Sequence, residues 1–489
     1  MVNGPFTFAP DGNALIGPVP GLRNFWSACA VMAGFAQGAG IGKVFADWLI
    51  EGEPGMDVFA MDVARFGEFA TRQYTRHKVV ENFGRRFMIA YPNEEPPAMR
   101  PWRTTALYDC LKASGAVFGA AFGLEHALWF APNAQQAVEA PTFHRSNAFS
   151  HVGEESQTVR EGVGFIETAN FAKYEVVGKG AADYLDVLLA GELPQIGRMR
   201  LSPMLSDGGR LLGDLSVGKL SENEFFIVGS GAAQMAHMRR FLVHLPKSGV
   251  AVHNRSTQLH GIAIAGPDSR NLMSRLTNAD MSAAVFRFMD IRRMEVSGVS
   301  AIVARVSFTG EMGYEIYCAP EYQRVLYEAL IIAGEGLGLR PFGARALMSL
   351  RLEKNFGAWT MDFREDFTPL QAGLDAFVAY DKTADFIGKQ AAVNERQTGA
   401  LQKRINLAVD ADGTDANGDE PIFKDGEIVG FVTSGGYGHT VGKSFAMGYV
   451  KPEAADAGGE FAVEILGDMR PATVQTEPAY DPAGLKMRG

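Results

Sequence analysis

Phe308-Thr-Gly-Glu-Met-Gly-Tyr-Glu-Ile-Tyr-Cys318 is the stretch of the chain that decides the fold. After the glycines, residues alternate: Tyr314 and Ile316 fall on one side of a strand, while Glu315 and Tyr317 fall on the other. A strand with one apolar side is typical of a sheet that covers a core. The pattern predicts that Glu315 presents its carboxylate away from that core.

A second strand of the same kind lies upstream, at Leu211-Leu-Gly-Asp-Leu-Ser-Val217. Alternation places Leu211, Leu215 and Val217 on one face and Asp214 on the other. Two interpretations stay open for this segment alone. Asp214 is either a solvated strand residue or a functional carboxylate held at the edge of a site.

A helix is predicted around residues 344–352, and it contains a cation. Ala344, Leu347, Met348, Arg351 and Leu352 follow helical spacing, so Arg351 interrupts an apolar stripe. A guanidinium in that position needs an anionic partner, because buried charges are normally paired. Residue spacing favours a structural Arg–carboxylate pair over a ligand-binding role.

Composition limits the class of protein. The 489 residues suggest about three domains, and 47% hydrophobic with 21% charged residues is typical of a folded, water-soluble chain. The net charge of −10 makes nucleic acid an unexpected partner. Three scattered cysteines, no secretory leader and no long apolar run predict a cytoplasmic protein without a disulfide framework or membrane segment.

Several apparent motifs fail on inspection. Neither Gly38-Ala-Gly-Ile-Gly-Lys43 nor Gly442-Lys-Ser444 has the spacing of a phosphate-binding loop. Histidines at i and i+4 are absent from the sequence, and no Ser, His and Asp set is readable, so no metal site or nucleophilic triad is predicted. The aromatic segment 125–130 is interpreted as a loop at a core corner rather than a pocket wall.

Turn signals and apolar runs divide the chain into four predicted parts. Residues 1–54 include a helix over Lys43 to Ile50, and residues 55–150 form a mixed α/β part with helices around Ala60 to Glu81. Residues 151–395 form an α+β domain, because strands and helices alternate without a regular βαβ rhythm. Residues 396–489 have closely spaced turns between short apolar runs, which predicts a small antiparallel β-barrel.

Together these segments resemble the dimethylglycine and sarcosine dehydrogenase family, whose carboxyl-terminal half is similar to the glycine cleavage T-protein. The resemblance covers essentially the whole chain and rests on ordered matches that run from the first residues to the barrel. The matching pieces are Val2-Asn-Gly-Pro, Pro10-Asp-Gly, Ile16-Gly-Pro, Gly34 to Lys43, Asp47-Trp48, Glu125 to Phe130, Phe308 to Glu315, Leu350-Arg-Leu-Glu353, Asp385-Phe-Ile-Gly-Lys389, Thr433-Ser-Gly435 and Ala446-Met-Gly-Tyr-Val450.

The resemblance implies a function and a set of site residues. In that family a flavin domain oxidises an N-methyl group to an iminium, and a tetrahydrofolate domain captures the one-carbon unit as methylene-tetrahydrofolate. By implication Asp214 is the catalytic acid/base and Glu315 binds the pterin. Arg351, Phe308 and Tyr314 are further implied tetrahydrofolate-binding residues, and Gly34 and Gly38 are expected near the flavin.

The chain departs from the family pattern in three places. Phe308 stands where the T-protein usually has tyrosine, so ring stacking can persist without the hydroxyl contact. At Gly229-Ser230 the T-protein asparagine is absent. The dinucleotide-binding glycine motif and the flavin-linking histidine are expected upstream of Met1, so residues 1–54 are interpreted as the carboxyl-terminal remnant of the flavin-oxidase domain.

We therefore expect a multidomain α+β protein of the dimethylglycine dehydrogenase type that catalyses tetrahydrofolate-dependent one-carbon transfer. Its donor is a small N-methyl amine, or the iminium or formaldehyde that the amine yields, and FAD is used only if the missing domain is supplied in trans by a partner. Two alternatives stay open. The chain is otherwise a stand-alone folate-dependent demethylase, or a non-catalytic folate-binding subunit or fragment that needs a flavin-domain partner.

Overall fold

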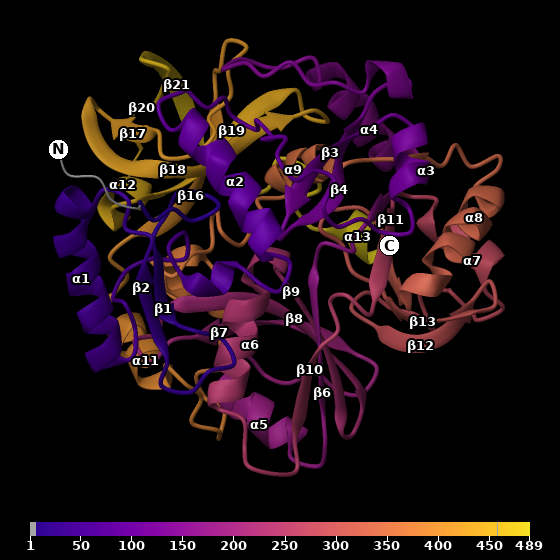
Figure 1. The fold of residues 1–489 in the computed structure, drawn as a ribbon. Coiled ribbons are helices and arrows are strands. Elements are labelled where there is room, and N and C mark those ends of the chain that lie inside the picture. The colour runs from indigo at the N-terminus through magenta and orange to yellow at the C-terminus, as the bar shows by residue number, and fades with distance from the viewer. Residues whose placement is uncertain (1–5, 457) are drawn as a thin grey trace.

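A computed structural model describes residues 6–456 and 458–489 of the chain. In Figure 1, helix α1 lies at one margin, two β-sheets occupy the lower and right-hand parts, and a barrel lies at the upper left. The predicted multidomain α+β class is confirmed. The Val2 to Pro5 part of the family pattern lies outside the described residues.

The chain begins with a small hairpin covered by a helix. Strand β1 (Leu15–Pro18) pairs antiparallel with β2 (Trp26–Cys29), and Trp48 of helix α1 packs against both. Gly17 has a φ of +104°, and a Cβ at that position would lie 2.6 Å from the Trp48 ring. Only glycine allows the helix to approach this closely.

Helix α1 (Gly34–Glu51) is longer than predicted, because it starts at Gly34 rather than at Lys43. Burial of Val44 and Trp48 stabilises the helix enough to extend it through glycines that each cost roughly 1 kcal/mol relative to alanine. Gly34 is exposed and Gly38 is half-buried, and both have open space where their Cβ atoms would be. The helix ends at Gly52 in the left-handed conformation, as the sequence predicts.

The following part combines helices with a hairpin. Helix α2 (Arg72–Arg85) begins after Thr71, whose hydroxyl accepts from the Tyr74 amide, so the predicted helical region around 60–81 is shifted toward the carboxyl terminus. The segment interpreted as an aromatic loop is instead a strand: β4 (Leu124–Phe130) pairs with β3 (Ala116–Ala121), and Trp129 is 1% exposed. The sequence analysis did not predict this strand, because the adjacent aromatic residues Trp129 and Phe130 interrupt the alternation of apolar and polar side chains. Helix α3 (Tyr108–Ala113) precedes the hairpin.

Two mainly antiparallel sheets form the centre of the fold. They pack together through apolar side chains that include Phe226 and Tyr317, whose rings lie 5.2 Å apart. The first sheet has the order β10 (Ala251–Asn254), β6 (Ala172–Val177), β9 (Glu224–Gly229), β8 (Leu211–Ser221), β7 (Met199–Leu205). The second has the order β12 (Ile291–Val296), β13 (Val299–Ala304), β14 (Gly313–Cys318), β11 (His260–Ala265), β5 (Gly164–Glu167), β15 (Arg340–Pro341).

Helices cover the outer faces of both sheets. Side chains of α5 (Ala181–Leu188) and α6 (Gln234–Val243) join the core of the first sheet. Those of α7 (Ser269–Leu276) and α8 (Gln323–Ala333) join the core of the second. No helix among the described residues is long and apolar enough to cross a membrane. The helices that follow the first hairpins are α4 (Phe149–Glu161), α5 (Ala181–Leu188), α6 (Gln234–Val243), α7 (Ser269–Leu276), α8 (Gln323–Ala333), α9 (Ala344–Glu353), α10 (Pro369–Ala372) and α11 (Lys389–Thr398).

The carboxyl-terminal part is a closed antiparallel barrel, which confirms the prediction from turn spacing. Its interior is filled by aliphatic side chains that include Leu407, Ile422 and Val463. Around the barrel the order is β16 (Lys403–Val409), β19 (Lys443–Val450), β18 (Glu427–Gly438), β17 (Pro421–Lys424), β20 (Phe461–Ile465), β21 (Asp468–Val474), and helices α12 (Pro452–Asp456) and α13 (Leu485–Arg488) lie near the end of the chain.

One buried arginine joins the parts. Arg160 of α4 donates to the Thr309 carbonyl at 2.8 Å and to Glu353 of α9 at 2.8 Å. Its Nε donates to the Thr440 hydroxyl of the barrel at 3.0 Å, and its guanidinium lies 3.7 Å from the Tyr480 ring centroid. Four distant segments of the chain are therefore fixed to a single side chain.

Candidate functional site

Asp214 lies on β8, opposite Pro203 of β7. Leu215 and Val217 are buried in the core, whereas Asp214 is half-buried on the other face, so the predicted alternation is confirmed. Among the described residues no other residue donates a hydrogen bond to its carboxylate. Burial raises the pKa of Asp214 to about 7, which is the range in which a carboxyl group can both accept and return a proton.

A buried histidine supports the strand behind Asp214. His237 lies 3.1 Å from the Leu212 carbonyl through Nε2 and 3.1 Å from the Tyr174 hydroxyl through Nδ1. Burial lowers its pKa to about 4, so His237 is neutral at physiological pH. The Trp359 ring packs 6.1 Å from His237, and its indole N–H is buried without a partner among the described residues.

Glu315 lies on β14 between the two sheets. The Tyr317 hydroxyl donates to its carboxylate, and the predicted sharing of one face is confirmed. Lys173 of β6 is fully buried, donates to the Ala169 carbonyl at 2.9 Å and acts electrostatically on both Glu315 and Glu167. Burial raises the pKa of Glu315, and the positive charge of Lys173 opposes that rise.

Arg351 is 1% exposed and paired with Asp362 at 2.8 Å. The structure therefore contains the buried Arg–carboxylate pair that the sequence favours on spacing. The same guanidinium donates to the Phe356 carbonyl at 3.1 Å, and the Phe356 ring lies 6.1 Å from Phe308 in a stacked arrangement. Arg351 thus holds the segment that packs on Phe308.

The buried residues of α9 are not limited to the predicted apolar stripe. Ala346, Ser349, Leu350 and Glu353 are also buried, because the helix is packed against β4, α4 and the barrel on several sides. A helix enclosed on most sides has no single apolar face, so the spacing alone misplaces the contacts.

The structure brings some predicted residues together and separates others. Phe308 and Arg351 share the segment around Phe356, whereas Tyr314 lies on the opposite face of β14 from Glu315. The Tyr314 ring is buried and stacks on Phe286 at 5.8 Å within the core. Gly34, which is exposed, and Gly38, which is half-buried, lie on α1, apart from these strands.

Three residues of this region are not found by the sequence reasoning. Lys173 is a lone cation in a strand. The signal that could have identified it is the alternation that places Lys173 on one face and the buried Tyr174 and Val176 on the other. Trp359 and Asp362 lie in an irregular segment between α9 and α10, where neither strand nor helix periodicity exists.

Family models divide the chain in a similar order. The GCVT N-terminal domain matches residues 107–382, the glycine cleavage T-protein C-terminal barrel domain matches residues 402–481, and the FAD dependent oxidoreductase central domain matches residues 51–105. The first match begins before residue 151, where the sequence predicted the boundary. In the structure, Leu107 and Leu111 of that extra stretch join the core of the second sheet.

Individual relatives agree with these matches. Dimethylglycine dehydrogenase, a mitochondrial protein of Mus musculus, is 36% identical over 482 residues, which is 98% of this chain and 55% of the relative. Aminomethyltransferase of Geobacillus sp. (strain WCH70) is 30% identical over 335 residues, covering 68% of this chain and 91% of the relative. The chain spans about half the length of the mouse relative.

A solved structure has the same fold over most of the chain. The glycine cleavage system aminomethyltransferase T from Bartonella henselae superposes with a TM-score of 0.68 at 24% identity, covering 78% of this chain and 98% of that one. The chain therefore belongs to the glycine cleavage T-protein family, and its named relatives are enzymes. The resemblance to the dimethylglycine and sarcosine dehydrogenases is confirmed as well.

Proposed function

We propose that the chain transfers a one-carbon unit from a small N-methyl amine to tetrahydrofolate. The unit arrives as an iminium or as formaldehyde and leaves as 5,10-methylene-tetrahydrofolate. One observation carries the proposal: the half-buried carboxylate of Asp214, which no other described residue contacts by a hydrogen bond, fits a basic amine of the folate. An unpaired, desolvated carboxylate is costly unless a ligand uses it.

The proposed role of Asp214 is proton transfer. When the folate amine bonds to the electrophilic carbon, its nitrogen becomes positively charged and must lose a proton. The second folate nitrogen then forms the other C–N bond and also loses its proton, while the donor amine leaves, or water leaves when the donor is formaldehyde. Asp214, with a pKa of about 7, accepts that proton without the large energy difference that a carboxylate of ordinary pKa would face. His237 and the Trp359 ring fix the strand and wall beside it.

The remaining residues have proposed roles in holding the folate. Glu315 accepts hydrogen bonds from the amino and ring N–H groups of the pterin, and Lys173 and Tyr317 keep its carboxylate in place. Phe308 supplies an aromatic face. Arg351 acts indirectly, because its guanidinium is committed to Asp362 and Phe356.

A direct assay tests the proposal. The chain is supplied with formaldehyde and tetrahydrofolate, and methylene-tetrahydrofolate formation is measured above the spontaneous reaction, alongside tetrahydrofolate binding by fluorescence quenching. Turnover above background supports transfer. Binding without turnover favours a non-catalytic folate-binding subunit, and the absence of binding overturns the proposal.

We expect the capture reaction to depend on pH through Asp214. Its ionised form accepts the proton, so kcat/KM should rise between about pH 6 and about pH 8, with a midpoint near the pKa of about 7. Folding raises this pKa, so as pH rises Asp214 ionises in the unfolded chain before it ionises in the folded chain. The free energy of unfolding therefore falls as pH rises from the ordinary carboxyl range to about 7. The measurement is a pH–rate profile corrected for the uncatalysed reaction; a profile that stays flat after correction contradicts the assignment.

We also propose that the surface of α1 and the end of α2 contacts a flavin-binding domain, whether in the same polypeptide or in a separate subunit. Such a domain supplies the oxidation of the N-methyl group. The basis is the family match at residues 51–105 and a set of exposed apolar side chains around it. Phe35 is fully exposed, and Ile50, Phe87 and Ile89 are largely exposed. Gly34 and Gly38 add a flat helix surface with open space above it.

A cytoplasmic location stays a prediction.

The exposed surface makes a measurable prediction. A chain of this sequence should bind an apolar fluorescent dye and self-associate, because large uncovered apolar patches are unusual on stable monomers. Phe35→Asp should reduce both effects and leave methylene-tetrahydrofolate formation intact. Ile332→Asp on α8 is the matched control, since Ile332 is also strongly exposed but lies outside this surface. Dye fluorescence and sedimentation velocity report the outcome, and equal effects of the two substitutions contradict the proposal.

A further inference from the structure

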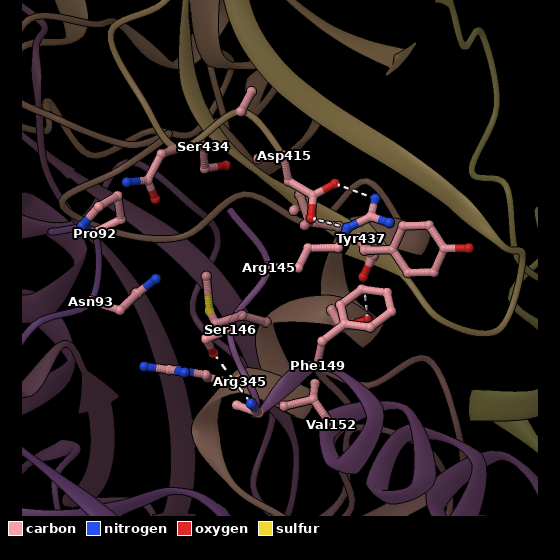
Figure 2. Close-up of a pocket in the computed structure, with 18 of the residues that line it drawn as sticks. Pro92, Asn93, Arg145, Ser146, Phe149, Val152, Arg345, Asp415, Ser434 and Tyr437 are labelled. Atoms are coloured by element: carbon pink, nitrogen blue, oxygen red, sulfur yellow. Dashed lines mark hydrogen bonds and ion pairs between the residues drawn. The ribbon is translucent and has the colours of Figure 1, made fainter. Parts of the chain in front are cut away.

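A cavity lies beside the barrel and has Arg351 in its wall, but it is separate from the other residues proposed for the folate. It has a volume of about 270 Å³ and is formed where residues 139–149, helix α9, the end of strand β18 and residues 415–417 meet (Figure 2). Asp214, Glu315 and Phe308 do not line it. The cavity is therefore built mainly by the barrel, α9 and the segment that enters α4.

One wall of the cavity is rigid and aromatic. Arg145 donates two hydrogen bonds to Asp415, at 2.9 and 2.8 Å, and a third to the Ser444 hydroxyl at 3.0 Å. Its guanidinium lies 4.7 Å from the Phe149 ring centroid and 4.3 Å from that of Tyr437. Figure 2 shows the Arg145–Asp415 pair beside both rings. Asp415 is saturated by donors and has no need of a ligand.

The opposite side has more donors than acceptors. Arg345 of α9 pairs with Glu139 through one nitrogen, while its Nη2 is buried and has no hydrogen-bond partner among the described residues. Glu139 also accepts from Ser146 at 2.9 Å and from the Trp129 indole at 3.2 Å, so it cannot satisfy further donors easily. Deeper in the cavity, Arg351 is 1% exposed, and its Nε likewise has no partner within the described chain.

Unpaired guanidinium N–H groups beside saturated carboxylates indicate a ligand that accepts hydrogen bonds. Each of the three arginines already faces one carboxylate: Asp415, Glu139 and Asp362. The site is thus close to electrically balanced, which favours a ligand with one negative charge over a dianion. Met348, Val152 and Phe149 offer apolar surface for the rest of the ligand.

We propose that this cavity binds a small monocarboxylate with an apolar body, at a site separate from that of the folate. The carboxylate accepts a charge-assisted hydrogen bond from Arg345 Nη2, the nitrogen that has no partner among the described residues. The apolar body lies against Phe149 and Met348. No covalent step is involved, and the inference does not depend on the proposed transfer reaction.

Isothermal titration calorimetry with sodium benzoate tests this inference on the full chain, with acetate and inorganic phosphate as comparison ligands. Benzoate is expected to bind with a Kd of about 1 mM or tighter, acetate more weakly, and phosphate least. Arg345→Gln should weaken benzoate binding about tenfold or more, because the charged donor is lost while the contact to Glu139 can persist. Arg324→Gln, on the exposed face of α8, is the matched control and should bind benzoate like the parent.

A second variant protects the test against misfolding. Met348→Trp adds bulk to the cavity wall while keeping all three arginines in the sequence, and should abolish benzoate binding while the circular dichroism spectrum is retained. Three results would overturn the inference: no binding up to about 10 mM, equal binding by Arg345→Gln and the parent, or displacement of benzoate by tetrahydrofolate. The last result would make the cavity an extension of the folate site.

Discussion

Asp214→Asn should reduce methylene-tetrahydrofolate formation by about 10²- to 10⁴-fold while tetrahydrofolate still binds. Asparagine keeps the shape of the side chain but cannot accept the amine proton. The residue makes no hydrogen bond with another described side chain, so the substitution breaks no contact of the fold. Single-turnover capture of formaldehyde and fluorescence titration with tetrahydrofolate separate the rate from the affinity.

Glu315→Gln is the matched comparison for Asp214→Asn. Both substitutions replace a half-buried carboxylate by its amide, but only Asp214 is proposed to move a proton. Glu315→Gln should mainly weaken tetrahydrofolate binding, because Glu315 is proposed to accept hydrogen bonds from the pterin. If Asp214→Asn turns over like the parent above the spontaneous rate, Asp214 is a solvated strand residue and the proposed mechanism fails.

Asp362→Ala should lower the free energy of unfolding by about 3–5 kcal/mol, because it leaves the buried Arg351 charge without its partner. Asp362 also accepts from the Thr433 and Ser434 hydroxyls, at 2.6 and 2.7 Å, and from the Ala358 amide at 3.0 Å, so three further donors lose their acceptor. Urea denaturation followed by circular dichroism measures the change.

Asp412→Ala is the control for this substitution. Asp412 lies in the barrel that Asp362 contacts, but its side chain is 89% exposed, so the change should stay within about 0.5 kcal/mol. Replacing both members of the buried pair, as Arg351→Met with Asp362→Leu, should recover part of the loss. Equal stability of Asp362→Ala and the parent would mean that solvent reaches the pair.

Strand faces were predictable because alternation is local information. Residues 211–217 have one buried side, whereas residues 313–318 are covered on both sides, but in each strand the period of two places the carboxylate, Asp214 or Glu315, on the face opposite Leu215 or Tyr314. The barrel was predictable for a similar reason, since closely spaced turns allow only short antiparallel strands. These predictions need no knowledge of distant segments.

Contacts between distant segments were not predictable. Lys173 and Glu315 come from different sheets, so no spacing in the sequence connects them. Arg351 is similar: spacing indicates that it needs an anion, but Asp362 lies in an irregular segment where side-chain direction cannot be derived. For helix α1 the local signal was present but misleading. The glycines before Lys43 predict a later start, but burial of Trp48 in the tertiary structure overrides their low helix propensity.

Arg160 limits how this chain can exchange parts with its relatives. A chimaera that received a foreign barrel would keep the arginine but lose the Thr440 hydroxyl and the Tyr480 ring unless the donor carried both. The remaining contacts, to Thr309, Glu311 and Glu353, belong to the acceptor. A viable recombinant therefore has to match residues on both sides of the junction, because substitutions at positions that share one partner do not act independently.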